Sequence, residues 1–230
     1  MRAPPAPPRL PSLAIEGRTD RFAVRRILCI GRNYAAHARE MGSDGREPPF
    51  HFSKSPDAML PADGPVVLPY PPLTQDLHHE IELVVALGAG GTNVSAEHAL
   101  ELVYGYAAGL DMTRRDVQDA AKKAGRPWTS SKDFDASAVV GPLRDAAVMG
   151  HPTSGSITLD VDGTPRQKGD LDEMIWSVAE IVMHLSRWGA LRPGDLIFTG
   201  TPAGVGAVVP GQTLVGRVLD LPPLVVTIGG

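Results

Sequence analysis

The feature that most constrains the fold is a series of short apolar runs separated by glycine, proline and aspartate. Apolar runs of about four to eight residues bounded by such turn formers are typical of β-strands. They predict strands at Ile27–Ile30, His51–Ser53, Ile81–Leu87, Tyr106–Asp111, Ser156–Val161, Leu196–Thr199 and Leu224–Ile228. Long helices do not separate these runs at regular intervals, which argues against a doubly wound parallel sheet. We therefore predict an α+β fold in which β structure dominates.

Three segments are predicted to be helical. Residues 177–188 carry apolar side chains at helical spacing. A short helix is predicted at Ala96–Leu102, where Ser95 precedes the first turn and could cap it. The third, Arg114–Ala124, is more polar and carries both signs of charge. These few helices fit a β-dominated domain.

Length and composition narrow the class of protein. The 230 residues fit one domain; we expect residues 1–23, which begin with a proline-rich stretch, to be an extended N-terminal segment and residues 24–230 to form a single domain. A net charge of −4 provides no basic surface for nucleic acid. No apolar stretch is long enough to cross a bilayer. The single Cys29 cannot form an internal disulfide, in agreement with a reducing cytoplasm.

The segment from His78 to Leu87 is the most informative for function. Side chains alternate along a strand, so Glu80 and Glu82 would share one face while apolar residues occupy the other. Two carboxylates this close repel each other, and burial adds to the cost. A divalent cation would relieve both, and oxygen ligands favour Mg²⁺, Mn²⁺ or Ca²⁺ over zinc. A solvated face with two ordinary surface acids explains the same pattern.

Asp111, at the end of a predicted strand, is a third candidate ligand. Aspartate is also a common turn former at this position, so the residues alone leave the metal site as one of two interpretations. His37 and Glu40 lie three residues apart, and one helical turn would place them on the same face as an imidazole–carboxylate pair. A surface helix with an incidental pair fits equally well. The glycine- and proline-containing stretch that follows, residues 42–49, is predicted to be a mobile lid.

Other polar residues have two interpretations each. Lys132 could bind a carboxylate or an oxyanion, although a lone lysine is usually solvated. Arg115 and Gln118 lie on a predicted helical turn after Asp111, where Arg115 could clamp a carboxylate or form a surface ion pair. Gly200 and Thr201 begin a glycine-rich loop that lacks the lysine of a phosphate-binding loop, which excludes nucleotide binding. The loop offers backbone donors and a hydroxyl, or it is only a tight turn.

Six motifs in a fixed order resemble the fumarylacetoacetate hydrolase family. They are G-R-N-Y-x-x-H-x-x-E from Gly31, F-x-K from Phe52, H-H-E-x-E-L from His78, L-D-M-T-x-R-D from Leu110, K-x-F from Lys132 and G-T-P-x-G-V-G from Gly200. The resemblance covers about residues 24–228. It implies a mixed β-sandwich roll with a few short helices, a catalytic domain at 24–230 and a homodimer.

The resemblance also implies roles for the candidate residues. Glu80, Glu82 and Asp111 become ligands of Mg²⁺ or Mn²⁺, with Ca²⁺ an option in crystals. His37 and Glu40 become the pair that activates water, and Lys132 joins them as a catalytic residue. The residues expected to contact substrate are Arg115, Gln118, Lys132, Gly200 and Thr201.

The expected reaction is hydrolysis of a carbon–carbon bond in an acylpyruvate, with fumarylpyruvate giving fumarate and pyruvate in aromatic degradation through gentisate. Two alternatives stay open. One is oxaloacetate decarboxylation, or isomerisation or decarboxylation of a hydroxylated dienedioate, on the same scaffold. The other is a keto-acid binding protein without catalysis. The pair His37 and Glu40 favours hydrolysis, because the alternative reactions do not necessarily need a pair that activates water.

Overall fold

A mixed eight-stranded sheet forms the centre of the chain. The computed structural model describes residues 6, 10–35 and 47–230. Seven strands follow one another across the sheet, and an eighth, β12 (Arg144–Asp145), pairs with β9 beyond the end of β11. In spatial order the seven are β4 (Phe50–Lys54), β3 (Arg26–Gly31), β15 (Asp195–Phe198), β8 (Ile81–Leu87), β9 (Val103–Asp111), β11 (Ala138–Val140) and β5 (Met59–Pro61).

Strand β8 lies in the middle of this sheet because it is apolar on both faces. It pairs antiparallel with β15 on one side and with β9 on the other, and all seven of its residues are buried. Ile81, Leu83 and Val85 point into the larger hydrophobic core. Val84 and Ala86 point to the opposite face, where they pack in a second core. The predicted alternation along this segment is confirmed.

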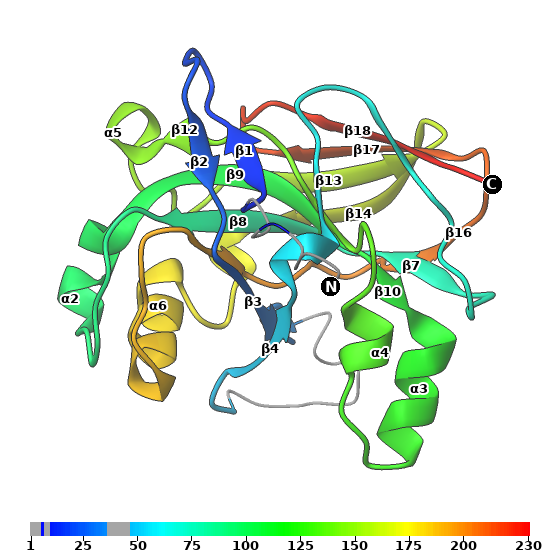
Figure 1. The fold of residues 1–230 in the computed structure, drawn as a ribbon, viewed down its shortest axis with the longest axis horizontal. Helices are drawn as coiled ribbons and strands as arrows, with labels where there is room; N and C mark the ends of the chain where they lie inside the picture. Colours follow the sequence, from blue (N-terminus) through cyan, green and yellow to red (C-terminus); the bar gives the residue numbers. More distant parts are fainter. Residues whose placement is uncertain (1–5, 7–9, 36–46) are drawn as a thin grey trace, which may run out of the picture.

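A second sheet packs over the first and closes the roll. It has five strands in the order β14 (Thr164–Asp170), β13 (Ser156–Val161), β17 (Thr213–Val218), β18 (Leu224–Ile228) and β6 (Val66–Leu68). Figure 1 shows β17 and β18 of this sheet above β8 and β9. Ile157, Leu159 and Leu214 from this sheet join the core that contains Ile81 and Leu83. The prediction of a β-dominated mixed roll is confirmed.

A small third sheet lies beside the two large ones. Its order is β10 (Thr113–Arg114), β7 (Leu77–His79) and β16 (Gly206–Val208), all antiparallel. Strand β7 ends at His79 and β8 begins at Ile81, so Glu80 occupies the junction between two sheets. Glu80 and Glu82 were predicted to share one strand, and the structure differs by this one-residue break.

The three predicted helices are present with small changes at their ends. Helix α6 (Val178–Trp188) begins after Ser177, whose hydroxyl accepts a hydrogen bond from Glu180 N in a capping box. The segment expected at 96–102 divides into α2 (Ala96–Ala99) and the 3-10 helix η2 (Leu100–Leu102). Ser95 makes no side-chain capping bond there, so that part of the prediction is wrong.

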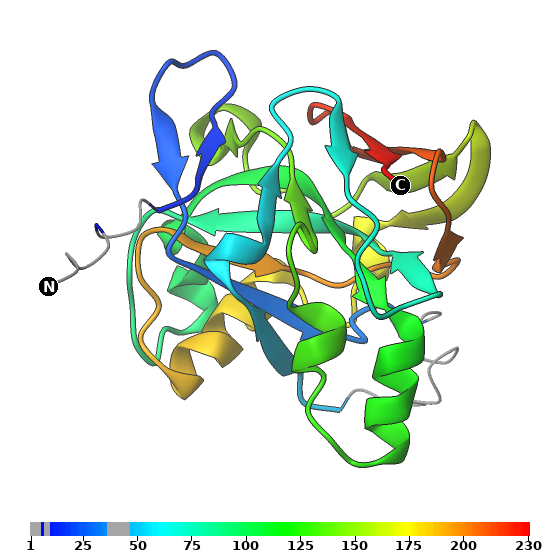
Figure 2. The same cartoon turned by 45° about the vertical axis from the view of Figure 1, so that its right-hand side comes forward.

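Helix α3 (Arg115–Lys123) lies under the small sheet, beside a short helix α4 (Thr129–Lys132) that the sequence analysis missed (Figure 2). Three further short helices were missed as well: η1 (Pro56–Ala58), α5 (Ala146–Met149) and η3 (Leu171–Glu173). Helices of three or four residues are too short to show an apolar period that sequence analysis could detect.

The N-terminal segment is more ordered than expected. Strands β1 (Ser12–Ala14) and β2 (Arg21–Ala23) form an antiparallel hairpin within the region predicted only to be extended. Leu13 is fully buried and joins the core that contains Val84, which explains why the hairpin folds against the roll. The boundary at residue 24 stays a prediction.

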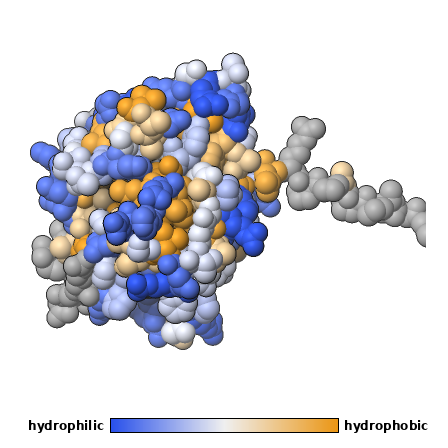
Figure 3. All heavy atoms as spheres, turned by 90° about the vertical axis from the view of Figure 1, so that its left-hand side faces the viewer, coloured by the Kyte–Doolittle hydropathy of each residue, from blue (hydrophilic) through white to orange (hydrophobic). Residues whose placement is uncertain are grey.

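The side of the molecule formed by α2 and α6 carries apolar side chains. Figure 3, which faces this side, shows them gathered near the middle of the surface among hydrophilic residues. A cavity of about 260 Å³ lies here, between η2, η3 and the first turn of α6. On its wall the hydroxyl of Tyr106 hydrogen bonds to Nδ1 of His151 at 2.7 Å. No helix in the described part of the chain is long and apolar enough to cross a membrane.

Candidate metal and substrate site

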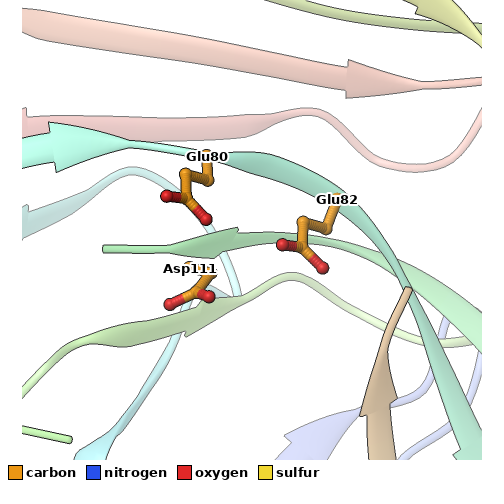
Figure 4. A group of neighbouring side chains, drawn as sticks. All are labelled: Glu80, Glu82 and Asp111. Atoms are coloured by element: carbon orange, nitrogen blue, oxygen red, sulfur yellow. The ribbon is translucent and has the colours of Figure 1, made fainter. Parts of the chain in front are cut away.

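Three buried carboxylates converge where β7, β8 and β9 meet (Figure 4). Glu80, Glu82 and Asp111 are 5%, 2% and 1% exposed, and each offers an oxygen within 4.8 Å of the other two. The backbone N–H of Asp111 donates to the carbonyl of Glu80 at 2.9 Å, which ties the end of β9 to the junction. Like charges in a buried site are costly without compensation. The solvated-face interpretation is therefore wrong.

Three buried or nearly buried cations surround the acids. Lys132 Nζ donates to Glu80 Oε2 at 2.8 Å and to Asp111 Oδ2 at 2.7 Å. The amine of Lys54 lies 2.8 Å from Asp111 Oδ1 and also donates to the carbonyls of Met112 and Lys132. Arg115 donates to Glu80 Oε1 at 2.5 Å. Lys132 is thus a buried partner of the acidic group, not a solvated lysine.

The charges of the site shift the pKa values of its members. Burial, together with the charges of Asp111 and Glu80, raises the pKa of Glu82 well above its usual range. Burial disfavours the ammonium of Lys132, but Asp111 and Glu80 outweigh it, so the pKa of this lysine is raised. The carboxylates thus make each other's charge less favourable, and Lys132 offsets part of that cost.

The group fits a hard divalent cation. Its donors are carboxylate oxygens only, which Mg²⁺, Mn²⁺ and Ca²⁺ prefer. Asp111 Oδ1 is buried and accepts no hydrogen bond with acceptable geometry, although Lys54 Nζ lies close to it. A buried oxygen without a donor is uncommon in proteins and has lone pairs left for an ion. The three residues could hold a metal together.

A pocket opens beside the acids, and four of the five residues predicted to contact substrate line it: Arg115, Gln118, Lys132 and Thr201. Arg115 and Gln118 lie on the first turns of α3, and Arg115 donates to Gln118 Oε1 at 2.5 Å. Both side chains are buried, so the surface ion-pair interpretation of Arg115 is wrong. The pocket is lined by Ile30, Gly31, Arg32, Phe50, Phe52, Glu80, Glu82, Asp111, Arg115, Gln118, Trp128, Lys132 and Thr201.

The glycine-rich loop supports the acids more than it faces the pocket. The N–H of Gly200 donates to Glu82 Oε2 at 2.6 Å. Thr201 lines the pocket, but its hydroxyl donates to the carbonyl of Ile81 at 2.7 Å. A hydroxyl has one hydrogen, so that of Thr201 is already used within the protein. Gly200 was expected to bind substrate; its N–H donates to a carboxylate of the acidic group, and its contact with substrate stays a prediction.

Gln167 on β14 is a residue of the site that the sequence analysis missed. Its Oε1 accepts from His79 Nδ1 at 2.8 Å and from Ile81 N at 3.1 Å. Its Nε2 donates to Thr201 Oγ1 at 2.8 Å and to the carbonyl of Pro202 at 2.9 Å. All four hydrogen-bonding positions of this buried amide are used. One side chain therefore holds both neighbours of Glu80 and the loop that contacts Glu82.

The ring of His79 is neutral and oriented by this contact. Burial lowers the pKa of His79 to about 4. Since Gln167 Oε1 is an acceptor, Nδ1 carries the proton. The neighbouring His78 lies within 2.9 Å of Asp76 and accepts a long hydrogen bond from Arg115. Both histidines support the site from outside the pocket.

His37 and Glu40, the predicted water-activating pair, lie outside the described residues, as do residues 42–46 of the predicted lid. The segments on either side of them are described. Asn33 is fully buried; its side chain bonds the N–H and carbonyl of Trp176 and the carbonyl of Thr199. Trp176 Nε1 donates to the carbonyl of Glu47. The residues before and after the pair are thus anchored next to the pocket.

A β-rich roll with three buried carboxylates at a pocket wall defines a hard-cation site of the kind used for acid–base and hydrolytic chemistry. Residues 26–228 match the family model described as fumarylacetoacetate (FAA) hydrolase, C-terminal. The chain belongs to the fumarylacetoacetate hydrolase family.

The relatives of this chain include proteins with named activities. The chain is 51% identical to a fumarylpyruvate hydrolase from Pseudomonas aeruginosa crystallised with Mn²⁺ and pyruvate, with a TM-score of 0.94 and 99% of each chain covered. It is 45% identical over 186 residues to a fumarylpyruvate hydrolase from Ralstonia sp, covering 80% of this chain and 94% of that protein. It is 44% identical over 184 residues to a mitochondrial oxaloacetate tautomerase from Bos taurus, covering 80% and 82%.

Proposed function

We propose that this chain is a divalent-metal-dependent hydrolase that cleaves a carbon–carbon bond in an acylpyruvate, with fumarylpyruvate giving fumarate and pyruvate. One observation carries the proposal: Glu80, Glu82 and Asp111 converge, buried, on a pocket lined by cationic side chains. The likeness to a fumarylpyruvate hydrolase that binds Mn²⁺ and pyruvate supports the choice of substrate.

We assign the metal to the three carboxylates. Glu80, Glu82 and Asp111 would hold Mg²⁺ or Mn²⁺, and we propose Mg²⁺ as the ion used in the cell because it binds oxygen ligands and is abundant. When bound, the ion acts as a Lewis acid towards the oxygens of a keto acid. Lys54 and Lys132 position Asp111, and Gly200 positions Glu82, so that the carboxylates keep one arrangement.

The chain's own residues would bind and cleave the substrate. Arg115 and Gln118 present donors from one turn of α3 towards the keto acid. The ammonium of Lys132 stabilises negative charge that develops on a substrate oxygen. His37, oriented by Glu40, takes a proton from water as the water oxygen attacks the distal carbonyl. The carbon–carbon bond then breaks, the acyl group leaves as a carboxylate, and the pyruvate methylene carbon takes a proton.

Oxaloacetate chemistry is the second candidate. Relatives include the bovine oxaloacetate tautomerase and an oxaloacetate decarboxylase from Dictyostelium discoideum that is 38% identical over 191 residues. Oxaloacetate has the same 2-keto acid group as an acylpyruvate and would enter the same pocket. Binding alone therefore does not distinguish acylpyruvate hydrolysis from oxaloacetate chemistry. A keto-acid binding protein without catalysis would bind both compounds and turn over neither.

Three further features complete the proposal. We propose a homodimer, supported by the apolar side chains on the face that Figure 3 shows. The cytoplasm is the proposed location, supported by a single cysteine that is buried and free. The proposed pathway is the degradation of aromatic compounds through gentisate, which follows from fumarylpyruvate as substrate.

The experiment is to follow the diketo absorbance of fumarylpyruvate with and without Mg²⁺ or Mn²⁺. Metal-dependent loss of absorbance is expected, together with its abolition in Glu80→Gln. His37→Ala should abolish turnover while metal binding persists. Glu97→Gln, an exposed glutamate on α2, is the matched control and should keep full activity. Absence of metal-dependent loss, with oxaloacetate consumed in a parallel assay, would assign the chain to the second candidate.

A further inference from the structure

Arg32 takes a backbone conformation that arginine seldom adopts. It directly follows β3 and has a φ of 57°, in the left-handed region. Residues other than glycine are uncommon there, and such conformations persist where the surrounding structure holds them, often at functional sites. Arg32 lines the same pocket as Glu80, Glu82 and Asp111. Its position was part of a recognised motif, but the sequence analysis assigned it no role.

Neighbouring residues hold Arg32 on both sides. Asn33, which follows it, is fully buried and tied by its side chain to Trp176 and Thr199. The guanidinium carbon of Arg32 lies 5.7 Å from the ring centre of Phe50. A Cβ on Gly31 would come within 2.1 Å of that ring, so only glycine lets Phe50 pack here. The ring of Phe50 in turn meets Trp128 edge-on, with ring centres 5.3 Å apart.

The charge of Arg32 is not used by the described part of the protein. Its Nε is buried without a hydrogen-bond partner, and among the described residues it forms no ion pair. The other cations near the acids differ: Arg115 and Lys132, which also line the pocket, contact Glu80, and Lys54 contacts Asp111. A buried unsatisfied donor calls for an explanation, and an anionic ligand supplies one. Among the described cations that line the pocket, Arg32 is the one without a carboxylate partner.

The position of Arg32 in the sheet separates it from the acidic group. Strand β3 is two places from β8 in the sheet, with β15 between them. Strands are spaced about 4.8 Å apart, so the backbones of Arg32 and Glu82 are separated by roughly 10 Å. Phe50 and Phe52 line the same pocket as the carboxylates and Arg32.

We propose that Arg32 binds the remote carboxylate of a dicarboxylic acylpyruvate, the one at the end of the acyl chain, and so sets the preference for diacid substrates. This inference rests on the proposed function and names the substrate class of the same site. The planar guanidinium matches a carboxylate with two parallel hydrogen bonds, which a lysine ammonium does not reproduce. Phe50 and Trp128 form the apolar wall along which the acyl chain lies.

The test compares two substrates that differ only in the remote carboxylate. Fumarylpyruvate carries it, and crotonylpyruvate has a methyl group in its place. In Mn²⁺-loaded enzyme, Arg32→Met should lower kcat/KM for fumarylpyruvate by about 10- to 100-fold, mainly through KM, as expected for loss of a charge-assisted hydrogen bond. For crotonylpyruvate the same change should cost less than about 3-fold, because that substrate never made the contact.

Two variants serve as references. Arg32→Lys keeps the charge and most of the length, so a smaller loss confined to fumarylpyruvate is expected; this variant also decides the question if Arg32→Met does not fold. Arg217→Met on β17 removes an arginine far from the pocket and should change neither substrate's kinetics. An equal loss on both substrates, or no loss on either, would overturn the assignment of Arg32.

Binding of the products decides the question independently of turnover. Quenching of tryptophan fluorescence, with Trp128 in the pocket wall, measures the affinity for fumarate and for its monoacid analogue crotonate. Wild-type protein should prefer fumarate by at least about 10-fold, and Arg32→Met should lose that preference. An unchanged preference would contradict the role of Arg32. Wild-type protein that prefers fumarate but hydrolyses neither acylpyruvate would instead contradict the proposed function alone.

Discussion

The backbone N–H of Gly200 points at Oε2 of Glu82 and donates a hydrogen bond of 2.6 Å. The two residues are far apart in sequence and meet because β15 and β8 are neighbours in the central sheet. A charge-assisted bond to a backbone donor holds a carboxylate in one orientation. Gly200 has a φ of +97°, and a Cβ there would come within 2.7 Å of Asn33 Cβ. The carboxylate's position therefore depends on the absence of a side chain at residue 200.

We expect Gly200→Ala to weaken binding of Mn²⁺ and to lower the free energy of unfolding by about 2 to 4 kcal/mol, from backbone strain and overpacking together. Isothermal titration with Mn²⁺ and chemical unfolding measure the two effects. Gly211→Ala is the matched control: its φ is +89°, and an added Cβ would meet nothing within 4 Å. It should cost only about 1 kcal/mol of strain and leave Mn²⁺ affinity unchanged. Equal effects of the two changes would contradict a special role for residue 200.

Glu82→Gln should change stability in opposite directions with and without metal. The substitution removes a buried negative charge beside Glu80 and Asp111, so metal-free variant should unfold at or above the Tm of metal-free wild type. Mn²⁺ at about 100 times its Kd should stabilise wild type by about 2.7 kcal/mol, and a Tm increase of roughly 5 to 10 °C follows for a chain of this length. Scanning calorimetry of both proteins should show that increase in wild type only. If Mn²⁺ raises the two Tm values alike, the ion does not bind at Glu82.

Gln167→Leu should destabilise the protein and disturb the site at the same time. The change leaves His79 Nδ1, Ile81 N and the carbonyl of Pro202 buried without partners, at a combined cost of about 3 to 5 kcal/mol. Urea unfolding measures this loss, and KM for fumarylpyruvate should rise because the amide no longer holds Thr201. Lys168→Leu on the same strand, at an exposed position, is the control. A stable variant with unaltered KM would show that the amide is dispensable.

Lys54→Met should be more damaging than the loss of an outer lysine. The side chain of Lys54 is fully buried against Asp111, and removing one partner of a buried pair typically costs about 3 to 5 kcal/mol. Lys122→Met on α3 removes a partly exposed lysine whose contact with Asp119 is 3.5 Å long, and it should cost less than about 1 kcal/mol. Comparison of the two unfolding free energies in metal-free protein checks the expectation. A similar small loss in both would mean that Lys54 is not needed to compensate Asp111.

Seven of the strands and the acidic group were within reach of sequence analysis because both follow local patterns, whereas the shorter or more polar strands such as β7 and β14 were not predicted. The apolar runs at 81–87 and 156–161 became β8 and β13 with the predicted ends. Alternation placed Glu82 on the correct face, and the motif order singled out Asp111 and Lys132. The break between β7 and β8 at Glu80 was not foreseen, because the pairing of His78 and His79 with β10 and β16 depends on partners distant in sequence.

The role of Gln167 in the site could not be predicted from the sequence. Its strand reads Thr-Pro-Arg-Gln-Lys-Gly-Asp, a polar segment with only Gln167 fully buried. Nothing local distinguishes this glutamine from an exposed one, since its burial comes from packing of the second sheet on the first. That Arg32 forms no ion pair with any described residue was hidden for the same reason. Counter-charges come from residues brought near by the fold, and a sequence pattern does not show which arginine lacks one.

The acidic group and the apolar wall of the pocket come from different parts of the fold, and this separation bears on how enzymes of this family diverge. Glu82 and Asp111 belong to the two central strands β8 and β9, whose neighbours are fully paired. Phe50 and Trp128 come from an edge strand and from the residue before a one-turn helix, where replacements disturb little of the core. Replacements of Phe50 or Trp128 can thus alter which acyl chain the pocket accepts. The three carboxylates that would bind the ion are left unchanged by such replacements. One ancestral scaffold can therefore give rise to several keto-acid activities by gradual change in the residues of the pocket wall.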